Sequence, residues 1–142
     1  MNPQVEQIIS LTFENTDPRL VIDSAKFSSK WNNNLNKFKE DENSVSVSMY
    51  INNHPRGRDR FYSTIDLRRN LMFISQVHPY DLTDYFYVYS EFSESDSFNL
   101  WRFADSETGK IVGKPMHTND IYEVCLKLRE LDSTKKAHID TN

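Results

Sequence analysis

Glycine is scarce in this chain of 142 residues, where it occurs only at Gly57, Gly109 and Gly113. Dinucleotide-binding folds and phosphate-cradling loops need closely spaced glycines just ahead of a helix. The three glycines form no such cluster, so these nucleotide sites are excluded. We therefore expect no cofactor.

Cysteine and long apolar runs are equally scarce. A single cysteine, Cys125, excludes an intramolecular disulfide and a zinc site built from thiolates. No window approaches the run of about 18 apolar residues that a membrane-spanning helix needs. The N-terminus, with Gln4 and Glu6, has neither the positive charge nor the apolar run of a signal peptide. These absences predict a soluble, cytoplasmic protein with no membrane partner.

Aromatic residues, in contrast, make up 13% of the chain, which argues against disorder. The length suits one compact domain, which we place at residues 1–132, followed by a flexible polar tail at residues 133–142. The net charge of −4 disfavours nucleic acid and anionic membranes and favours a basic partner.

Hydrophobic periodicity predicts three helices. Residues 3–12 carry apolar side chains at helical spacing, and Asp23 and Ser24 are N-cap candidates for a second helix that would run to about residue 38. Thr118 and Asn119 precede a third apolar stripe. The apolar positions of the second and third helices are Phe27, Trp31, Leu35 and Phe38, and then Ile121, Val124, Cys125, Leu128 and Leu131.

Between residues 44 and 112 the apolar residues alternate with polar ones, which is typical of half-buried strands. The links between these segments are too short for parallel crossovers, so the strands should pair antiparallel. The predicted fold class is α+β: a mostly antiparallel sheet of about five to six strands, with two N-terminal helices and one C-terminal helix packed on it. The predicted strands are 44–51, 61–67, 71–77, 85–92, 98–103 and 110–112, with Gly109 at a left-handed turn position.

The four histidines give no catalytic or metal-binding pattern, since none lies four residues from another on a predicted helix. His78 lies near Asp81 and Asp84, but a transition-metal site usually needs a second histidine or a thiolate. Cys125 belongs to the apolar stripe of the last helix, where burial makes a thiol unreactive. We therefore predict no metal, no catalytic residue and no enzymatic activity.

An acidic segment interleaved with aromatic residues is the strongest functional signal. Between Asp81 and Glu107 lie seven acidic residues and one basic residue, a net charge of −6. Carboxylates steer a basic partner, and tyrosine and tryptophan supply contact area. A solvated sheet edge kept soluble by its acids would show the same pattern. The predicted contact residues are Asp84, Tyr87, Glu91, Glu94, Asp96 and Trp101.

An arginine-rich segment at residues 54–69 supports an alternative function, a nucleic-acid-binding or nuclease-like protein. Arginines interleaved with an aromatic residue bind phosphates and bases. Asp59 and Asp66 dilute this segment, however, and the net charge of the chain opposes a polyanion. The basic and aromatic residues concerned are His54, Arg56, Arg58, Arg60, Tyr62, Arg68 and Arg69.

Short motifs over residues 27–131 resemble the CdiI-type immunity proteins of bacterial contact-dependent growth inhibition systems. The sequence departs from the family pattern in a hairpin strand, where Tyr62 stands in place of a common Trp, and at Ser75-Gln76-Val77, where a Gln-Asn is common. The contact surface varies within the family, so no contact residue is transferred by position. The similar segments are Phe27-Ser28-Ser29-Lys30-Trp31 with Leu35, Val45-Ser46-Val47-Ser48-Met49-Tyr50, Phe61-Tyr62 with Leu71 to Val77, Asp105-Ser106-Glu107-Thr108-Gly109-Lys110-Ile111, and Thr118-Asn119-Asp120-Ile121.

The resemblance implies an immunity protein that binds the C-terminal domain of its cognate toxin and blocks the toxin's active site. Many such toxins are nucleases with basic clefts, which an acidic surface would fit. Another protein-binding inhibitor, such as an anti-defence protein, would need the same surface chemistry and stays open. The sequence also leaves the oligomeric state and the strand order open.

Overall fold

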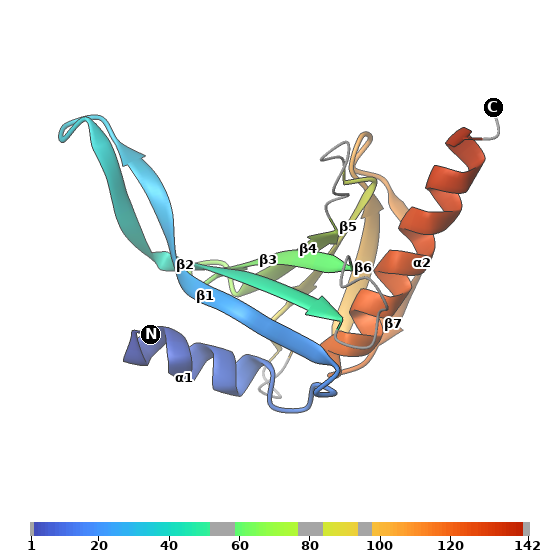
Figure 1. The fold of residues 1–142 in the computed structure, drawn as a ribbon, viewed down its shortest axis with the longest axis horizontal. Helices are drawn as coiled ribbons and strands as arrows, with labels where there is room; N and C mark the ends of the chain where they lie inside the picture. Colours follow the sequence, from blue (N-terminus) through green and yellow to red (C-terminus); the bar gives the residue numbers. More distant parts are fainter. Residues whose placement is uncertain (1, 52–58, 77–83, 94–97, 141–142) are drawn as a thin grey trace.

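A computed structural model describes residues 2–51, 59–76, 84–93 and 98–140, with side chains described up to Lys135. Its strands form a single antiparallel sheet in which each strand pairs with its neighbours in sequence, in the order β1-β2-β3-β4-β5-β6-β7 (Figure 1). The elements are α1 (Pro3–Thr12), β1 (Leu20–Asn32), β2 (Lys37–Ile51), β3 (Arg60–Asp66), β4 (Leu71–Gln76), β5 (Phe86–Glu91), β6 (Leu100–Asp105), β7 (Ile111–His117) and α2 (Ile121–Asp140).

The predicted fold class is wrong in its count of elements. The sheet has seven strands instead of five to six, and the described residues contain two helices instead of three. The predicted antiparallel pairing is present throughout the sheet. The error comes from residues 24–38, the predicted second helix, which instead belong to β1 and the start of β2.

Residues 20–51 form a long hairpin because buried and exposed side chains alternate from one residue to the next, as in a strand. Ala25 and Phe27 are both buried, while Lys26 between them is exposed, and Phe27 lies opposite the buried Val45. The asparagine-rich segment 32–36 has low helix propensity and makes the turn, with Asn36 at φ 49°. The spacing of aromatic residues that suggested a helix thus arises from pairing across a turn.

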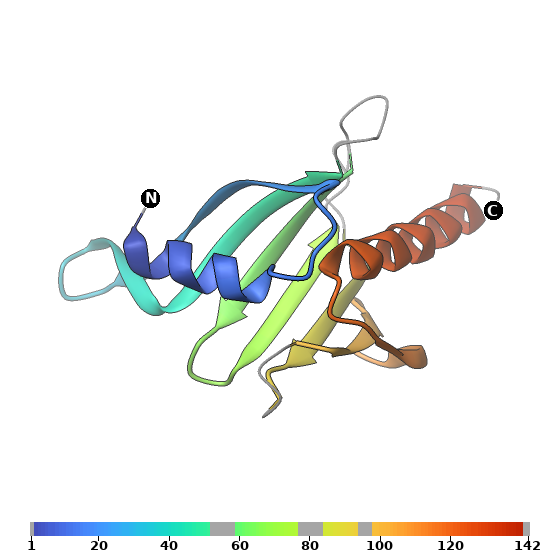
Figure 2. The ribbon, with the colours of Figure 1, turned by 90° about the horizontal axis from the view of Figure 1, so that it is seen from below.

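Both helices cover the same face of the sheet (Figure 2). α1 packs against β1, and α2 packs against β4 and β5. Side chains that alternate along the strands meet the buried residues of both helices in one hydrophobic core. Fully buried members of this core include Met49, Phe61, Met72, Trp101, Ile121 and Leu128.

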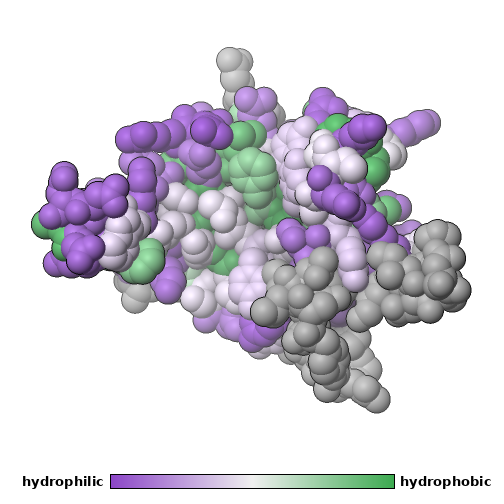
Figure 3. All heavy atoms as spheres, turned by 90° about the horizontal axis from the view of Figure 1, so that it is seen from above, coloured by the Kyte–Doolittle hydropathy of each residue, from purple (hydrophilic) through white to green (hydrophobic). Residues whose placement is uncertain are grey.

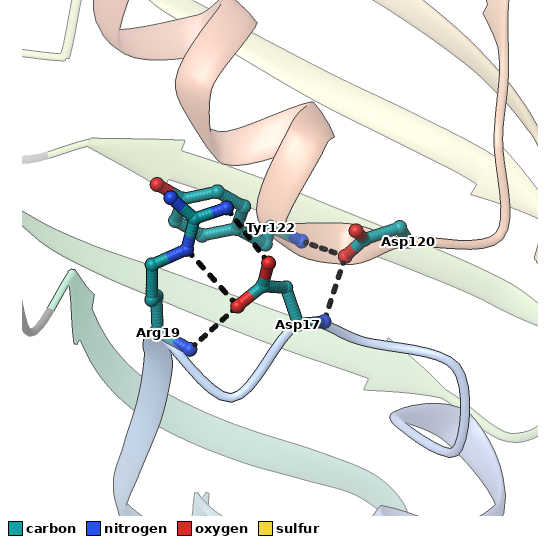
Figure 4. Close-up of polar contacts among 4 residues, drawn as sticks. All are labelled: Asp17, Arg19, Asp120 and Tyr122. Carbon is teal, nitrogen blue, oxygen red and sulfur yellow. Dashed lines mark hydrogen bonds and ion pairs between the residues drawn. The ribbon is translucent and has the colours of Figure 1, made fainter.

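A polar clasp joins the segment before β1 to the start of α2 (Figure 4). The Asp17 backbone N–H donates to Asp120 Oδ1 at 3.0 Å, and the same oxygen accepts from the Tyr122 N–H in the first turn of α2. The Asp17 carboxylate also pairs with Arg19, whose guanidinium lies 4.5 Å from the centre of the Tyr122 ring. The hydrogen bond from the Arg19 side chain holds the pKa of Asp17 below its usual value.

Most other predicted elements are confirmed, but β7 runs to His117, five residues beyond its predicted end. The first helix spans Pro3–Thr12 as expected, the strands after residue 44 are present, and Gly109 adopts a φ of +72°. α2 continues beyond residue 132 to Asp140, so part of the predicted tail is helical, while the domain boundary itself stays a prediction. Within the described ranges, neither helix is both long and apolar enough to cross a bilayer.

Candidate protein-binding surface

We call the face of the sheet opposite the helices the helix-free face. It is formed by every second residue of each strand, the residues whose side chains point away from the core. Its rows follow from the strand register: Ser48, Tyr62, Ser75 and Tyr87 form one row across β2 to β5, and Phe73 and Tyr89 belong to the next. Figure 3 shows this face, with apolar and weakly polar side chains in its centre and hydrophilic ones gathered at its margins. No helix covers this surface in the described parts of the chain.

Three aromatic rings pack together in the middle of the helix-free face. The ring centre of Phe73 lies 6.4 Å from that of Tyr87 and 6.1 Å from that of Tyr89, and the two tyrosines are 6.1 Å apart. The side chains are half-buried only by one another and their neighbours on the sheet, and Tyr62 beside them is 45% exposed. Rigid aromatic groups of this kind supply contact area at low cost in conformational entropy.

Charged residues lie around the rings, and two of them, Arg60 and Asp23, already form an ion pair. Arg60 donates to Asp23 Oδ2 at 2.7 Å and lies over the Tyr50 ring, 5.4 Å from its centre. This hydrogen bond lowers the pKa of Asp23 and raises that of Arg60. Glu91, at the end of β5, is exposed and makes no ion pair with another described residue.

The structure brings only part of the predicted acidic site together. Tyr87 and Glu91 lie on the helix-free face, on either side of Tyr89 along β5. Asp84 is exposed just before β5, and its negative charge adds to the effect of burial in raising the pKa of Asp132 on α2. Glu94 and Asp96 lie outside the described residues.

Trp101 is not a surface residue. Its side chain is 0% exposed, and its Nε1–H donates to the backbone oxygen of Thr118 at 2.9 Å. Trp101 belongs to the core because it shares the inward alternation of β6 with Phe103. This placement corrects the expectation that Trp101 contacts a partner directly.

The arginine-rich segment does not form one patch among the described residues. Arg60 begins β3 and is paired with Asp23, whereas Arg68 and Arg69 follow the far end of the same strand. A strand of seven residues separates the two groups by about 20 Å. His54, Arg56 and Arg58 lie outside the described residues.

The other groups considered for chemistry occupy structural positions where they are described. Cys125 is completely buried, as predicted, and burial raises the pKa of its thiol far above the usual value. Within the described residues no group of three or more histidine, cysteine, aspartate or glutamate side chains is arranged to hold a metal ion. His117 is exposed on β7, while His78 and Asp81 lie outside the described residues.

Comparison with known proteins adds no relative to the description of this fold and its surface. No protein-family model, curated protein or solved structure matches the sequence or the fold.

Sequence reasoning missed Phe73 and Tyr89 as site residues and named Tyr62 only for the nucleic-acid alternative. Each of these residues alternates with buried residues inside a correctly predicted strand. An aromatic residue at a strand position that points away from the core was therefore the feature that could have identified them. What the sequence lacked was the register, because only cross-strand pairing shows that Phe73 lies directly opposite Tyr89.

Proposed function

We propose that this protein is a non-enzymatic inhibitor that binds a basic partner protein on its helix-free face. The observation that carries this proposal is the cluster of Phe73, Tyr87 and Tyr89 on a sheet face that no described helix covers. Aromatic clusters with a polar rim are typical of the centre of protein interfaces. The net charge of −4 favours a partner of positive charge.

The resemblance to CdiI-type immunity proteins supplies the kind of partner: the C-terminal toxin domain encoded immediately upstream of this protein. An inhibitor of this kind needs shape and charge complementarity and no reacting group. Blocking the toxin's active site would then neutralise it. The test therefore uses that purified domain as its probe.

The experiment compares the wild-type protein with a double variant, Tyr87→Ser with Tyr89→Ser, by calorimetric titration against the toxin domain and by growth rescue of cells that express it. Truncating an interface hot spot costs about 2 kcal/mol, so each substitution should weaken binding about 30-fold. Leu11→Ser is the matched control, because Leu11 is 66% exposed on α1, which covers the opposite face of the sheet. It should bind and protect like the wild type.

Two outcomes contradict the proposal. If the toxin domain does not bind the wild-type protein, the partner is wrong. If it binds but the double variant, shown to be folded by circular dichroism, protects cells as well as the wild type does, the helix-free face is not the interface. Retention of the protein by heparin at moderate salt would instead favour the nucleic-acid alternative.

A further inference from the structure

A hollow beside α1, on the face of the sheet that the helices cover (Figure 2), has the size of a small-molecule site. Its volume is about 590 Å³, within the range in which proteins hold such ligands. Ile8 and Leu11 of α1 form one wall, and Phe92 after β5 and Phe98 before β6 form another. The buried Ile65 of β3 also lines the hollow.

The aromatic wall is held in place by the protein itself. The Phe92 N–H donates to the backbone oxygen of Asn70 at 2.7 Å. The Phe92 ring packs edge to face on that of Phe98, with ring centres 5.3 Å apart, and Phe98 is buried against Trp101. A ligand would therefore meet a preformed wall, which lowers the entropy that binding costs.

Both walls carry apolar side chains that remain in contact with water. Leu11 is 66% exposed and Phe92 is 41% exposed. A ligand body placed between them would remove apolar surface of both side chains from water, which is the main favourable contribution to binding in such sites. The body of the ligand is therefore expected to be aliphatic or aromatic.

The charge at the hollow is negative. Two carboxylates line it, those of Glu14 and Asp66. Asp66 Oδ1 accepts from the N–H groups of Arg68 and Arg69 in its own turn, and the Arg69 side chain lies 3.7 Å from Oδ2. Glu14 is exposed just beyond the end of α1, and neither lysine nor arginine occurs among the described residues that line the hollow. Glu14 is therefore the carboxylate that a cationic ligand would meet.

The end of α1 adds to this negative potential. The helix ends at Thr12, which lines the hollow, and its last turn contains no basic residue. The C-terminal end of a helix carries a partial negative charge and favours a cation. Asn15, Asn70 and Asn119 also line the hollow, and each amide group includes an acceptor oxygen. A protonated amine, which has three N–H donors and no acceptor, suits these surroundings.

We propose that this hollow binds a small apolar amine. The body of the amine packs between Leu11 and Phe92, and its ammonium group lies beside Glu14 and the C-terminal end of α1. An apolar acid is the less favoured occupant, because its carboxylate would meet the same negative charges. The site lies on the opposite side of the sheet from the helix-free face, so it is separate from the proposed protein-binding surface.

The test titrates two probes of similar size into the protein at about pH 7: phenylbutylamine, which is a cation, and phenylbutyrate, which is an anion. Amide chemical shifts measured by NMR report both the affinity and the location of binding. The usual free energy per atom of a small ligand gives the amine a dissociation constant on the order of 1 mM. The acid should bind about tenfold more weakly, because one exposed carboxylate attracts the amine and repels the acid through solvent.

Two substitutions separate the charge from the apolar surface. Glu14→Gln should bring the two dissociation constants to within about threefold of each other, the remaining difference being due to the helix end. Leu11→Ser should weaken both probes by about fivefold. Both side chains are exposed, so both variants should fold. Glu40→Gln is the matched control, because Glu40 is exposed on β2 outside the hollow, and it should bind both probes as the wild type does.

The shifted amides should centre on the end of α1, the β3–β4 turn and Phe92. The absence of shifts with both probes up to about 10 mM, or shifts centred on the helix-free face, overturns the site. An acid that binds as tightly as the amine, or a Glu14→Gln protein that discriminates between the probes as the wild type does, overturns the assignment of an amine. Because the titration contains this chain alone, its result is independent of whether the toxin domain binds.

Discussion

Replacing Asp132 by asparagine should remove a pH-dependent loss of stability. The Asp132 side chain is 0% exposed on α2. Burial, with the negative charge of Asp84 as the second cause, raises its pKa from 3.8 to about 7. A hydrogen bond with the Phe86 backbone and the charge of Lys135 act in the opposite direction, but they are the smaller effects.

The sign of the effect follows from proton linkage. Between pH 4 and pH 7 the folded protein holds a proton on Asp132 that the unfolded chain has lost, so this group lowers the free energy of unfolding as the pH rises. The pKa difference corresponds to about 4 kcal/mol at 1.36 kcal/mol per pKa unit. Asparagine keeps the shape and the acceptor oxygen but has no charge to bury.

The assay is urea denaturation of both proteins at several pH values, followed by circular dichroism. The two should be nearly equally stable at about pH 4, and the variant should be more stable by about 2–4 kcal/mol at about pH 8. Using the difference between the two proteins cancels the titration of all other groups. A difference that stays constant between these pH values would refute the claim that the buried carboxyl group keeps its proton to near pH 7.

Three other substitutions have clear expected outcomes. Glu91→Lys should slow association with the toxin domain and reduce its salt dependence in stopped-flow measurements, with no change in melting temperature, because Glu91 is exposed and outside the described ion pairs. Trp101→Phe should cost about 2–3 kcal/mol in urea denaturation, since it leaves a cavity and an unpaired Thr118 carbonyl group; equal stability would contradict the buried placement. Gly109→Ala should cost about 1 kcal/mol through its φ of +72° alone, because a Cβ there meets no atom within 4 Å; an unchanged melting temperature would argue against this backbone conformation.

The sequence predicted local structure well wherever one period continued through a whole segment. The strands after residue 44 alternate strictly, and the first and last helices carry apolar stripes bounded by capping residues. Residues 24–38 failed because Phe27, Trp31 and Phe38 fit a helical spacing, while the evidence for a hairpin was the shorter Ala25–Phe27 alternation and the asparagine turn. A pattern that spans a turn cannot be distinguished from a helix by intervals alone.

The site was harder to predict because it depends on which strands are neighbours. Tyr87 was identified from charge and aromatic content, but its partner Phe73 lies 14 positions away in sequence, in another strand. Trp101 was misassigned because clustering with acids was given more weight than its alternation with Phe103. Charge clustering along a chain does not distinguish the two faces of a sheet, whereas side-chain alternation does.

The clasp between Asp17 and Asp120 has a kinetic consequence. Every strand pairs with its sequence neighbour, so the sheet can grow one hairpin at a time, and only short loops need to close. The clasp, in contrast, joins residues 103 positions apart. We therefore expect it to form after the transition state, as the last step that anchors the two ends of the chain. Asp120→Ala would then speed unfolding and leave the folding rate unchanged, which a chevron plot would show directly.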